Sequence, residues 1–276
     1  MPAGSWRRVA LAGTTGATVV LVYFSPWLLS PFLFKPSKHP VPNTLIFSVA
    51  AAGAVLAAAM ARAFPRYRVA VVRILAVTAF VYLSWRLAIF WIDWLATLPL
   101  SSSEAYWLYR GPGSGALGLL PSAAIVLVGG RFLFGMSIRQ QWNGRLVFAW
   151  RDFLYGGSVG IAMSVFAIAC MALAGTGRLA WEPNWSSHGV NVFSNLYEEV
   201  LVRSLLLQIA KREGGNRFAM IWTGLIFGSM HGLTWMALSF AVVTWIIAWV
   251  VLRAGSLWAG WVFHQVIDII VDSWSH

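Results

Sequence analysis

Residues 153–174 read FLYGGSVGIAMSVFAIACMALA and contain no charged side chain. A helix needs about 20 mostly apolar residues to cross the hydrocarbon core of a bilayer, so this stretch predicts a transmembrane helix. Only helices and closed barrels satisfy their backbone hydrogen bonds in lipid, and a continuous apolar run lacks the alternation of a barrel strand. The stretch therefore predicts an all-α membrane protein.

Apolar runs of similar length recur along the chain. We expect spans near 10–30, 42–62, 69–98, 115–134, 153–174, 190–210, 217–233, 235–252 and 256–272. The predicted fold is an all-α, polytopic transmembrane bundle of about eight to nine helices that form one integrated membrane domain. Residues 1–189 supply transmembrane helices of unassigned role, and residues 190–272 form the predicted catalytic core.

The composition supports membrane residence. Of the 276 residues, 59% are hydrophobic and 11% are charged, whereas a soluble domain carries about 25% charged residues. The single cysteine, Cys170, excludes an intramolecular disulfide and a paired redox motif. Because it lies in an apolar run, we expect an inert packed thiol. The start, Trp6-Arg7-Arg8 before an apolar stretch, is typical of an uncleaved signal anchor, since no small-residue cleavage site follows.

The basic residues predict how the chain is oriented. The net charge is +11, but the charges lie in short loops between apolar runs, which favours a membrane topology over nucleic-acid binding. With the N-terminus inside, inner segments hold 14 of the 20 basic residues and outer segments hold 4. We therefore expect an integral protein of a bacterial inner (cytoplasmic) membrane, with the N-terminus inside and the C-terminus outside.

Several ionisable side chains fall inside the predicted spans, where charge is costly and marks an internal pair or a functional cavity. They are Arg86, Asp93, Glu198, Glu199, Arg203, His231, His264 and Asp268. Arg86 and Asp93 are two helical turns apart on one face, which predicts a structural role by mutual pairing or by pairing with another span. The remaining six gather in the last third of the chain, and we predict that they form one functional site.

The spacing within this group predicts separate roles. Glu199 and Arg203, at i and i+4, are placed to form an ion pair. Glu198 is rotated by about 100° from that pair and is left to point into a cavity. His264 and Asp268 are again i and i+4 on one face. The predicted topology puts these groups and His231 at similar depth, which favours a water-filled pocket open toward the outer face.

Such a pocket is suited to hydrolysis by activated water. Glu198 is the candidate general base, and His231 is placed to help position the water. His264 and Asp268 are candidates to stabilise the oxyanion that forms when water attacks a carbonyl. Asp268 donates directly only when protonated, and otherwise acts by fixing the tautomer of His264. No Ser or Cys is placed with a His–Asp partner, so a covalent mechanism lacks a candidate.

A metal centre is the main alternative for the same residues. Two His and a Glu suffice for a catalytic zinc, but the chain lacks the H-E-x-x-H helix that supplies ligands at fixed spacing. We therefore predict no cofactor, with a divalent metal such as zinc as the alternative.

Three motifs carry a resemblance to a known family: Glu198-Glu199-Val200-Leu201-Val202-Arg203, Phe227-Gly228-Ser229-Met230-His231 and His264-Gln265-Val266-Ile267-Asp268. They resemble the E-E-x-x-x-R, F-x-x-x-H and H-x-x-x-N/D signatures of the CPBP family, which comprises the CAAX-processing and bacteriocin-processing (ABI) intramembrane proteases. The resemblance covers roughly residues 190–272. It departs from the family where Val202 stands for a common Phe, Ser204 for a common Gly and Asp268 for the commoner Asn.

The resemblance implies a glutamate-dependent intramembrane endopeptidase. By it, Glu198 matches the water-activating acid with His231 as its aid, Glu199 and Arg203 match the supporting pair, and His264 and Asp268 match the oxyanion-stabilising positions. The implied partners are the lipid bilayer and a peptide or membrane-associated protein substrate. The predicted outward opening favours exported peptides or sorted protein tails over a prenylated CAAX substrate. The alternatives are a CAAX-type prenyl-protein endopeptidase, a non-catalytic peptide-binding immunity or regulatory protein, and a transporter or proton relay.

Overall fold

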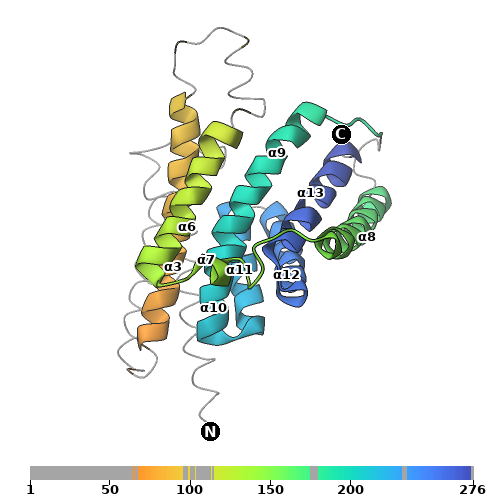
Figure 1. The fold of residues 1–276 in the computed structure, drawn as a ribbon. Helices are drawn as coiled ribbons and strands as arrows, with labels where there is room; N and C mark the ends of the chain where they lie inside the picture. Colours follow the sequence, from red (N-terminus) through yellow and green to blue (C-terminus); the bar gives the residue numbers. More distant parts are fainter. Residues whose placement is uncertain are drawn as a thin grey trace, which may run out of the picture. The chain divides into compact units, whose positions relative to one another are not determined.

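The structure, a computed structural model, describes residues 68–95, 115–174, 180–231 and 235–274, together with the single residues 65, 99, 103 and 113. All regular secondary structure in these residues is helical (Figure 1). The predicted all-α fold is therefore confirmed.

The described residues form a series of helical segments. In chain order they are α3 (Arg68–Leu95), the π-helix η2 (Gly115–Leu119), α6 (Leu120–Phe134), α7 (Ile138–Gln141), α8 (Trp150–Ala174), α9 (Trp185–Glu198), the π-helix η3 (Glu199–Leu206), α10 (Leu207–Gly214), α11 (Asn216–Met230), α12 (Trp235–Ala254) and α13 (Leu257–Trp274). Helices α6 and α12 end where Gly135 and Gly255 take positive φ angles of 66° and 65°, a conformation that glycine adopts without steric cost.

The predicted span near 69–98 and those that follow it coincide with described helices. The span predicted at 190–210 corresponds to α9, η3 and α10 in succession. Within the described residues, three stretches are long and apolar enough to cross a membrane: Arg68–Ile92, Leu117–Phe134 and Trp150–Leu173. The spans predicted at 10–30 and 42–62 lie outside the described residues, so the nine-span topology stays a prediction. The side chains of Arg86 and Asp93 also lie outside the description, and their pairing stays a prediction too.

The chain divides into two compact units. The first comprises Met1–Tyr82 and Ile209–Trp245, and the second comprises Leu83–Gln208 and Ile246–His276. In the first unit, the indole of Trp222 on α11 donates to the Thr78 hydroxyl on α3 across 3.2 Å, and both side chains are fully buried. The division of the sequence at residue 190 was based on the position of the motifs, and it stays a prediction.

In the second unit, α6, α9, α13 and α8 lie side by side in that order (Figure 1). Helix α8 approaches α13 through Gly156 and Gly160, which are spaced as in the small-xxx-small motifs that let membrane helices pack closely. A Cβ atom on Gly156 would collide with the carbonyl oxygen of Ala259, and one on Gly160 would lie 3.1 Å from the carbonyl oxygen of Phe263. The two glycines therefore set how close α8 comes to α13.

Helices α9 and α13 run antiparallel, as their polar contacts show. His188 Nε2 lies 3.1 Å from Ser273 Oγ at one end, and Glu199 meets His264 at the other. Between them, the Gln265 amide donates to the Asn191 carbonyl across 2.7 Å. Interhelical hydrogen bonds of this kind stabilise helix pairs in membranes, and here they fix the register in which the two helices present their site residues.

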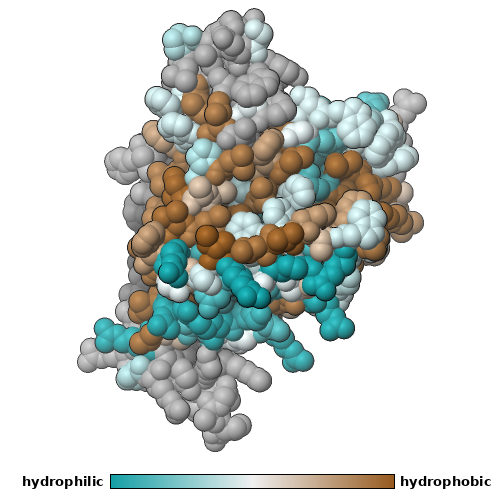
Figure 2. All heavy atoms as spheres, viewed as in Figure 1, coloured by the Kyte–Doolittle hydropathy of each residue, from teal (hydrophilic) through white to brown (hydrophobic). Residues whose placement is uncertain are grey.

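Many apolar side chains point away from the helix contacts. On α6 they include Ile125, Val128 and Phe132, and on α8 they include Val165 and Leu173, which is 90% exposed. Figure 2 shows hydrophobic side chains over much of the visible face, as expected for helices that meet lipid. Cys170 is exposed as well, so the prediction of a packed thiol is wrong: its side chain lies on the outward face of α8 rather than in a helix contact.

Candidate functional site

The site begins at the junction of α9 and η3. Helix α9 is capped at its N-terminus by Asn184, whose side chain accepts a hydrogen bond from the backbone N–H of Ser187 across 3.1 Å. The helix ends at Glu198, and the next eight residues, Glu199–Leu206, continue as a π-helix. The i, i+4 spacing of Glu199 and Arg203 predicts a regular α-helix here, so the π-helix is a difference from the prediction. Because a π-helix bonds i to i+5 and so has wider turns, residues i and i+4 lie nearer to one line; such segments are frequent at functional sites.

The predicted ion pair between Glu199 and Arg203 is present. Arg203 Nη1 lies 3.1 Å from Glu199 Oε1, and both side chains are completely buried. A charge in such a place is stable only when an opposite charge compensates it. Each residue of the pair is therefore held in position by the other.

His264 comes to the same carboxylate from α13. Its Nδ1 lies 3.0 Å from Glu199 Oε1, and since a carboxylate paired with arginine accepts hydrogen bonds, Nδ1 is the donor. The sequence leaves two roles open for Asp268: to donate to the oxyanion directly when protonated, or to fix the tautomer of His264. The structure gives Nδ1 a hydrogen bond to Glu199, which depends on how η3 and α13 pack and not on the spacing within α13. Both roles of Asp268 stay predictions.

The other ring nitrogen of His264 faces two further carboxylates. Nε2 lies 3.8 Å from Glu198 Oε2 and 3.9 Å from Asp268 Oδ2. These separations exceed hydrogen-bond length. The Glu198 side chain is 21% exposed, whereas that of Glu199 is 0% exposed. Of the two glutamates, Glu198 is thus the one that water and a substrate can reach.

One buried residue of this cluster was not among the predicted site residues. The amide Nδ2 of Asn195 donates to Asp268 Oδ2 across 2.7 Å, and Asn195 is 3% exposed. The sequence did contain a signal for this residue. Asn195 lies three residues before Glu198 and four before Glu199, so it shares their face of the helix. The side chains of Asn195, Glu198, Glu199, His264 and Asp268 thus form one polar cluster between α9 and α13.

His231 lies in the first unit, just after the end of α11. Its Nδ1 donates to the carbonyl oxygen of Phe227 across 2.9 Å, and its ring lies 4.6 Å and 4.4 Å from the rings of Phe227 and Phe240. These contacts fix the ring and its tautomer locally. The role of His231 in the site stays a prediction from the sequence.

Comparison with known proteins bears on this cluster. The family model of the type II CAAX prenyl endopeptidase Rce1-like proteins matches residues 148–270, a range that runs from the start of α8 through nearly all of α13 and contains the three motifs. The resemblance to the CAAX protease family is thereby confirmed. The match supports a CAAX-type intramembrane endopeptidase, and so a peptide or protein substrate in a membrane. No curated protein and no solved structure matches the chain.

A metal centre was the alternative for the residues of this CAAX protease-like region. Within the described residues, no three His, Cys, Asp or Glu side chains are grouped as ligands for one metal ion. The Glu199 carboxylate is already engaged by Arg203 and His264. The absence of a metal stays a prediction, and we derive no step through a metal.

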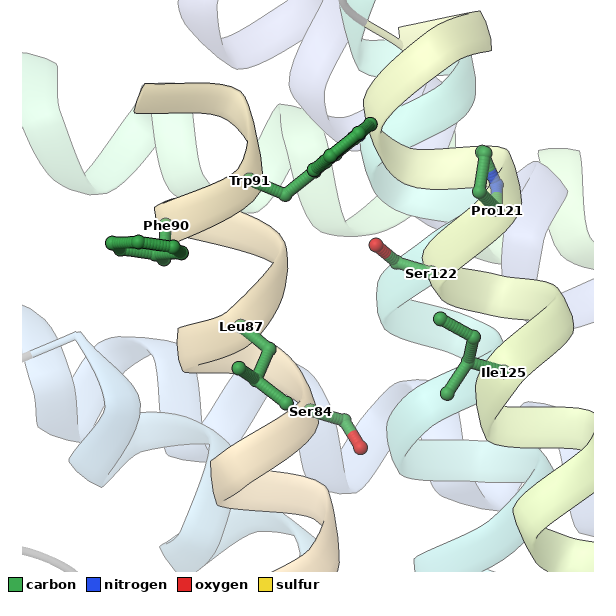
Figure 3. Close-up of a pocket in the computed structure, with 7 residues that line it drawn as sticks. All are labelled: Ser84, Leu87, Phe90, Trp91, Pro121, Ser122 and Ile125. Carbon is green, nitrogen blue, oxygen red and sulfur yellow. The ribbon is translucent and has the colours of Figure 1, made fainter. Parts of the chain in front are cut away.

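An apolar cavity lies in the second unit, between α3 and α6. Its volume is about 370 Å³, and its lining comprises Ser84, Leu87, Phe90, Trp91, Pro121, Ser122 and Ile125 (Figure 3). The carbonyl oxygen of Ser84 accepts a hydrogen bond from the Tyr197 hydroxyl across 2.8 Å. Since Tyr197 directly precedes Glu198, one wall of the cavity is bonded to the helix that carries the site.

Proposed function

We propose that this protein is a glutamate-dependent intramembrane endopeptidase in which Glu198 activates the attacking water. The observation that carries the proposal is the position of Glu198 Oε2, 3.8 Å from His264 Nε2. A water oxygen about 2.8 Å from each atom fits this separation. Glu198 is accessible and has no arginine at its carboxylate oxygens among the described ion pairs, so it is suited to take the proton.

Each group then has a distinct part in the reaction. Glu198 removes a proton from water while the water oxygen bonds to the carbonyl carbon, and the carbonyl oxygen becomes an oxyanion. His264 donates from Nδ1 to Glu199, so with both nitrogens protonated it presents an N–H at Nε2 to that oxyanion. When the C–N bond breaks, Glu198 returns the proton to the leaving amine. Arg203 holds Glu199, and Glu199 holds His264.

Two classes of substrate remain for this reaction. The predicted topology places the N-terminus on the inner side of a bacterial cytoplasmic membrane and opens the site toward the outer side. It favours exported peptides or sorted protein tails as substrates. The name of the matching family favours a protein with a prenylated CAAX terminus, and the apolar cavity of about 370 Å³ suits a hydrocarbon chain. Peptides that end in a farnesylated Cys-a-a-X sequence, compared with the same peptides without the farnesyl group, separate the two classes.

The decisive experiment is cleavage by purified protein in liposomes, with mass spectrometry of the products. Glu198→Gln removes the base, and we expect cleavage to fall by about 10²–10⁴-fold while the protein still inserts and folds. Glu182→Gln is the matched control, since it makes the same change at an exposed acid in the same unit. Undiminished cleavage by Glu198→Gln would refute the proposed mechanism.

The proposed mechanism uses no metal. We therefore expect cleavage to survive prolonged dialysis against EDTA and 1,10-phenanthroline. Loss of cleavage that zinc then restores would show that a metal takes part.

A further inference from the structure

We propose that Asn195 is a positioning residue for the proposed hydrolysis, acting through Asp268. Its amide Nδ2 donates to Asp268 Oδ2 across 2.7 Å, and the same oxygen lies 3.9 Å from His264 Nε2. Asp268 is thus held beside the imidazole but outside hydrogen-bond range of it. This inference rests on the proposed function, because Nε2 is the atom that faces Glu198.

The bond matters because a carboxylate at this place has an alternative partner. The terminal torsion of an aspartate rotates easily, and Asp268 and His264 are one helical turn apart on α13. Without the Asn195 amide, the carboxylate is free to close on Nε2 and to accept its N–H. That nitrogen would then be unable to donate to the oxyanion.

The other contacts of α9 with α13 argue against a purely structural role for Asn195. Other bonds already join α9 to α13: His188 to Ser273, the Gln265 amide to the Asn191 carbonyl and the Trp261 indole to the Val192 carbonyl. None of these three bonds involves a site carboxylate. The amide of Asn195, in contrast, bonds a site carboxylate, and Asn195 is 3% exposed.

Steady-state cleavage by Asn195→Ala tests the proposal, with Asn191→Ala as the control on the same helix. Asn191 contacts α13 through its backbone carbonyl, which the substitution keeps. We expect kcat of Asn195→Ala to fall at least about 10-fold. This loss is smaller than the 10²–10³-fold loss from removing a direct oxyanion donor, and we expect KM to stay within about twofold of the wild-type value. An unchanged kcat, or equal losses in both variants, would overturn the proposal.

A double-mutant cycle asks whether Asn195 acts through Asp268. If it does, Asn195→Ala combined with Asp268→Ala is no slower than Asp268→Ala alone, since the effects of coupled residues are not additive. Losses that multiply would show independent action and would overturn the proposal. Asn195→Ser, which keeps a buried hydroxyl too short to reach Asp268, replaces Asn195→Ala if the alanine variant does not fold.

A readout without activity separates this proposal from the proposed function. The sequence has four aspartates, Asp93, Asp152, Asp268 and Asp272, so carboxyl-¹³C aspartate labelling gives few NMR signals, and Asp268→Ala identifies the one of interest. We expect Asn195→Ala to shift this signal and Asn191→Ala to leave it unchanged. An unshifted signal overturns the positioning role, whereas cleavage that survives Glu198→Gln refutes the proposed function alone.

Discussion

His264 Nδ1 donates to Glu199 Oε1 across 3.0 Å, and Arg203 Nη1 lies 3.1 Å from the same oxygen. One carboxylate oxygen therefore carries both the arginine that balances its charge and the imidazole that it orients. This arrangement separates the two adjacent glutamates. Glu199 holds the site together from a fully buried position, and Glu198 is left to meet water and substrate.

The buried pair predicts a large loss of stability when its cation is removed. In Arg203→Met the Glu199 carboxylate keeps its burial but loses its balancing charge, which costs about 3–5 kcal/mol of the free energy of unfolding. Arg212→Met is the control. The Arg212 side chain is 47% exposed and lies 3.2 Å from Glu213, and such a pair contributes about 0–1 kcal/mol. Denaturant unfolding in detergent measures both variants, and equal losses would contradict the buried pair.

A second prediction concerns Gly260 on α13. A Cβ atom there would collide with the Val251 side chain and lie 2.9 Å from Glu199 Oε2. Gly260→Ala therefore crowds the carboxylate that orients His264, and we expect a loss of about 1–3 kcal/mol together with a lower kcat. Gly157→Ala is the control, because its Cβ would lie 3.9 Å from Val262 Cγ1, an ordinary contact. Wild-type kcat in Gly260→Ala would show that Glu199 tolerates displacement.

Much of this site follows from spacing within a single helix. The contact of Glu199 with Arg203 and the shared face of His264 and Asp268 are both i, i+4 relationships, so the sequence predicts them. Helix positions from residue 69 onward follow from apolar run length in the same way. These features depend on helix geometry alone, which the order of residues specifies directly.

Other features depend on how two distant helices pack. Asn195 and Asp268 are 73 residues apart, and Glu199 meets His264 because α9 and α13 adopt one antiparallel register out of several. The π-helix at Glu199–Leu206 has no signature in the apolar pattern. Cys170 lies in an apolar run, as buried and lipid-facing residues both do, and hydropathy does not distinguish the two in a membrane helix.

The close approach of α8 to α13 yields a third prediction. A Cβ atom on Gly156 would collide with the backbone carbonyl oxygen of Ala259, which cannot rotate away. We therefore expect Gly156→Ala to lower the thermal unfolding temperature and to weaken cleavage, since α13 carries His264. The adjacent Gly157→Ala makes the same change where space exists, and it should retain the wild-type temperature. Equal temperatures for the two variants would mean that α8 and α13 pack less closely than the structure shows.

The last prediction concerns the side of the membrane on which the chain ends. Arg131, Arg139 and Arg151 lie exposed at the end of α6, on α7 and at the start of α8, where the 14-to-4 distribution places an inner segment. Nine spans then carry the C-terminus outside. Alkaline phosphatase fused after His276 should be active and green fluorescent protein should not fluoresce. A fusion within residues 142–144 should give the opposite pattern. Fluorescence at His276 would remove one span from the topology and would turn the site toward the cytoplasm.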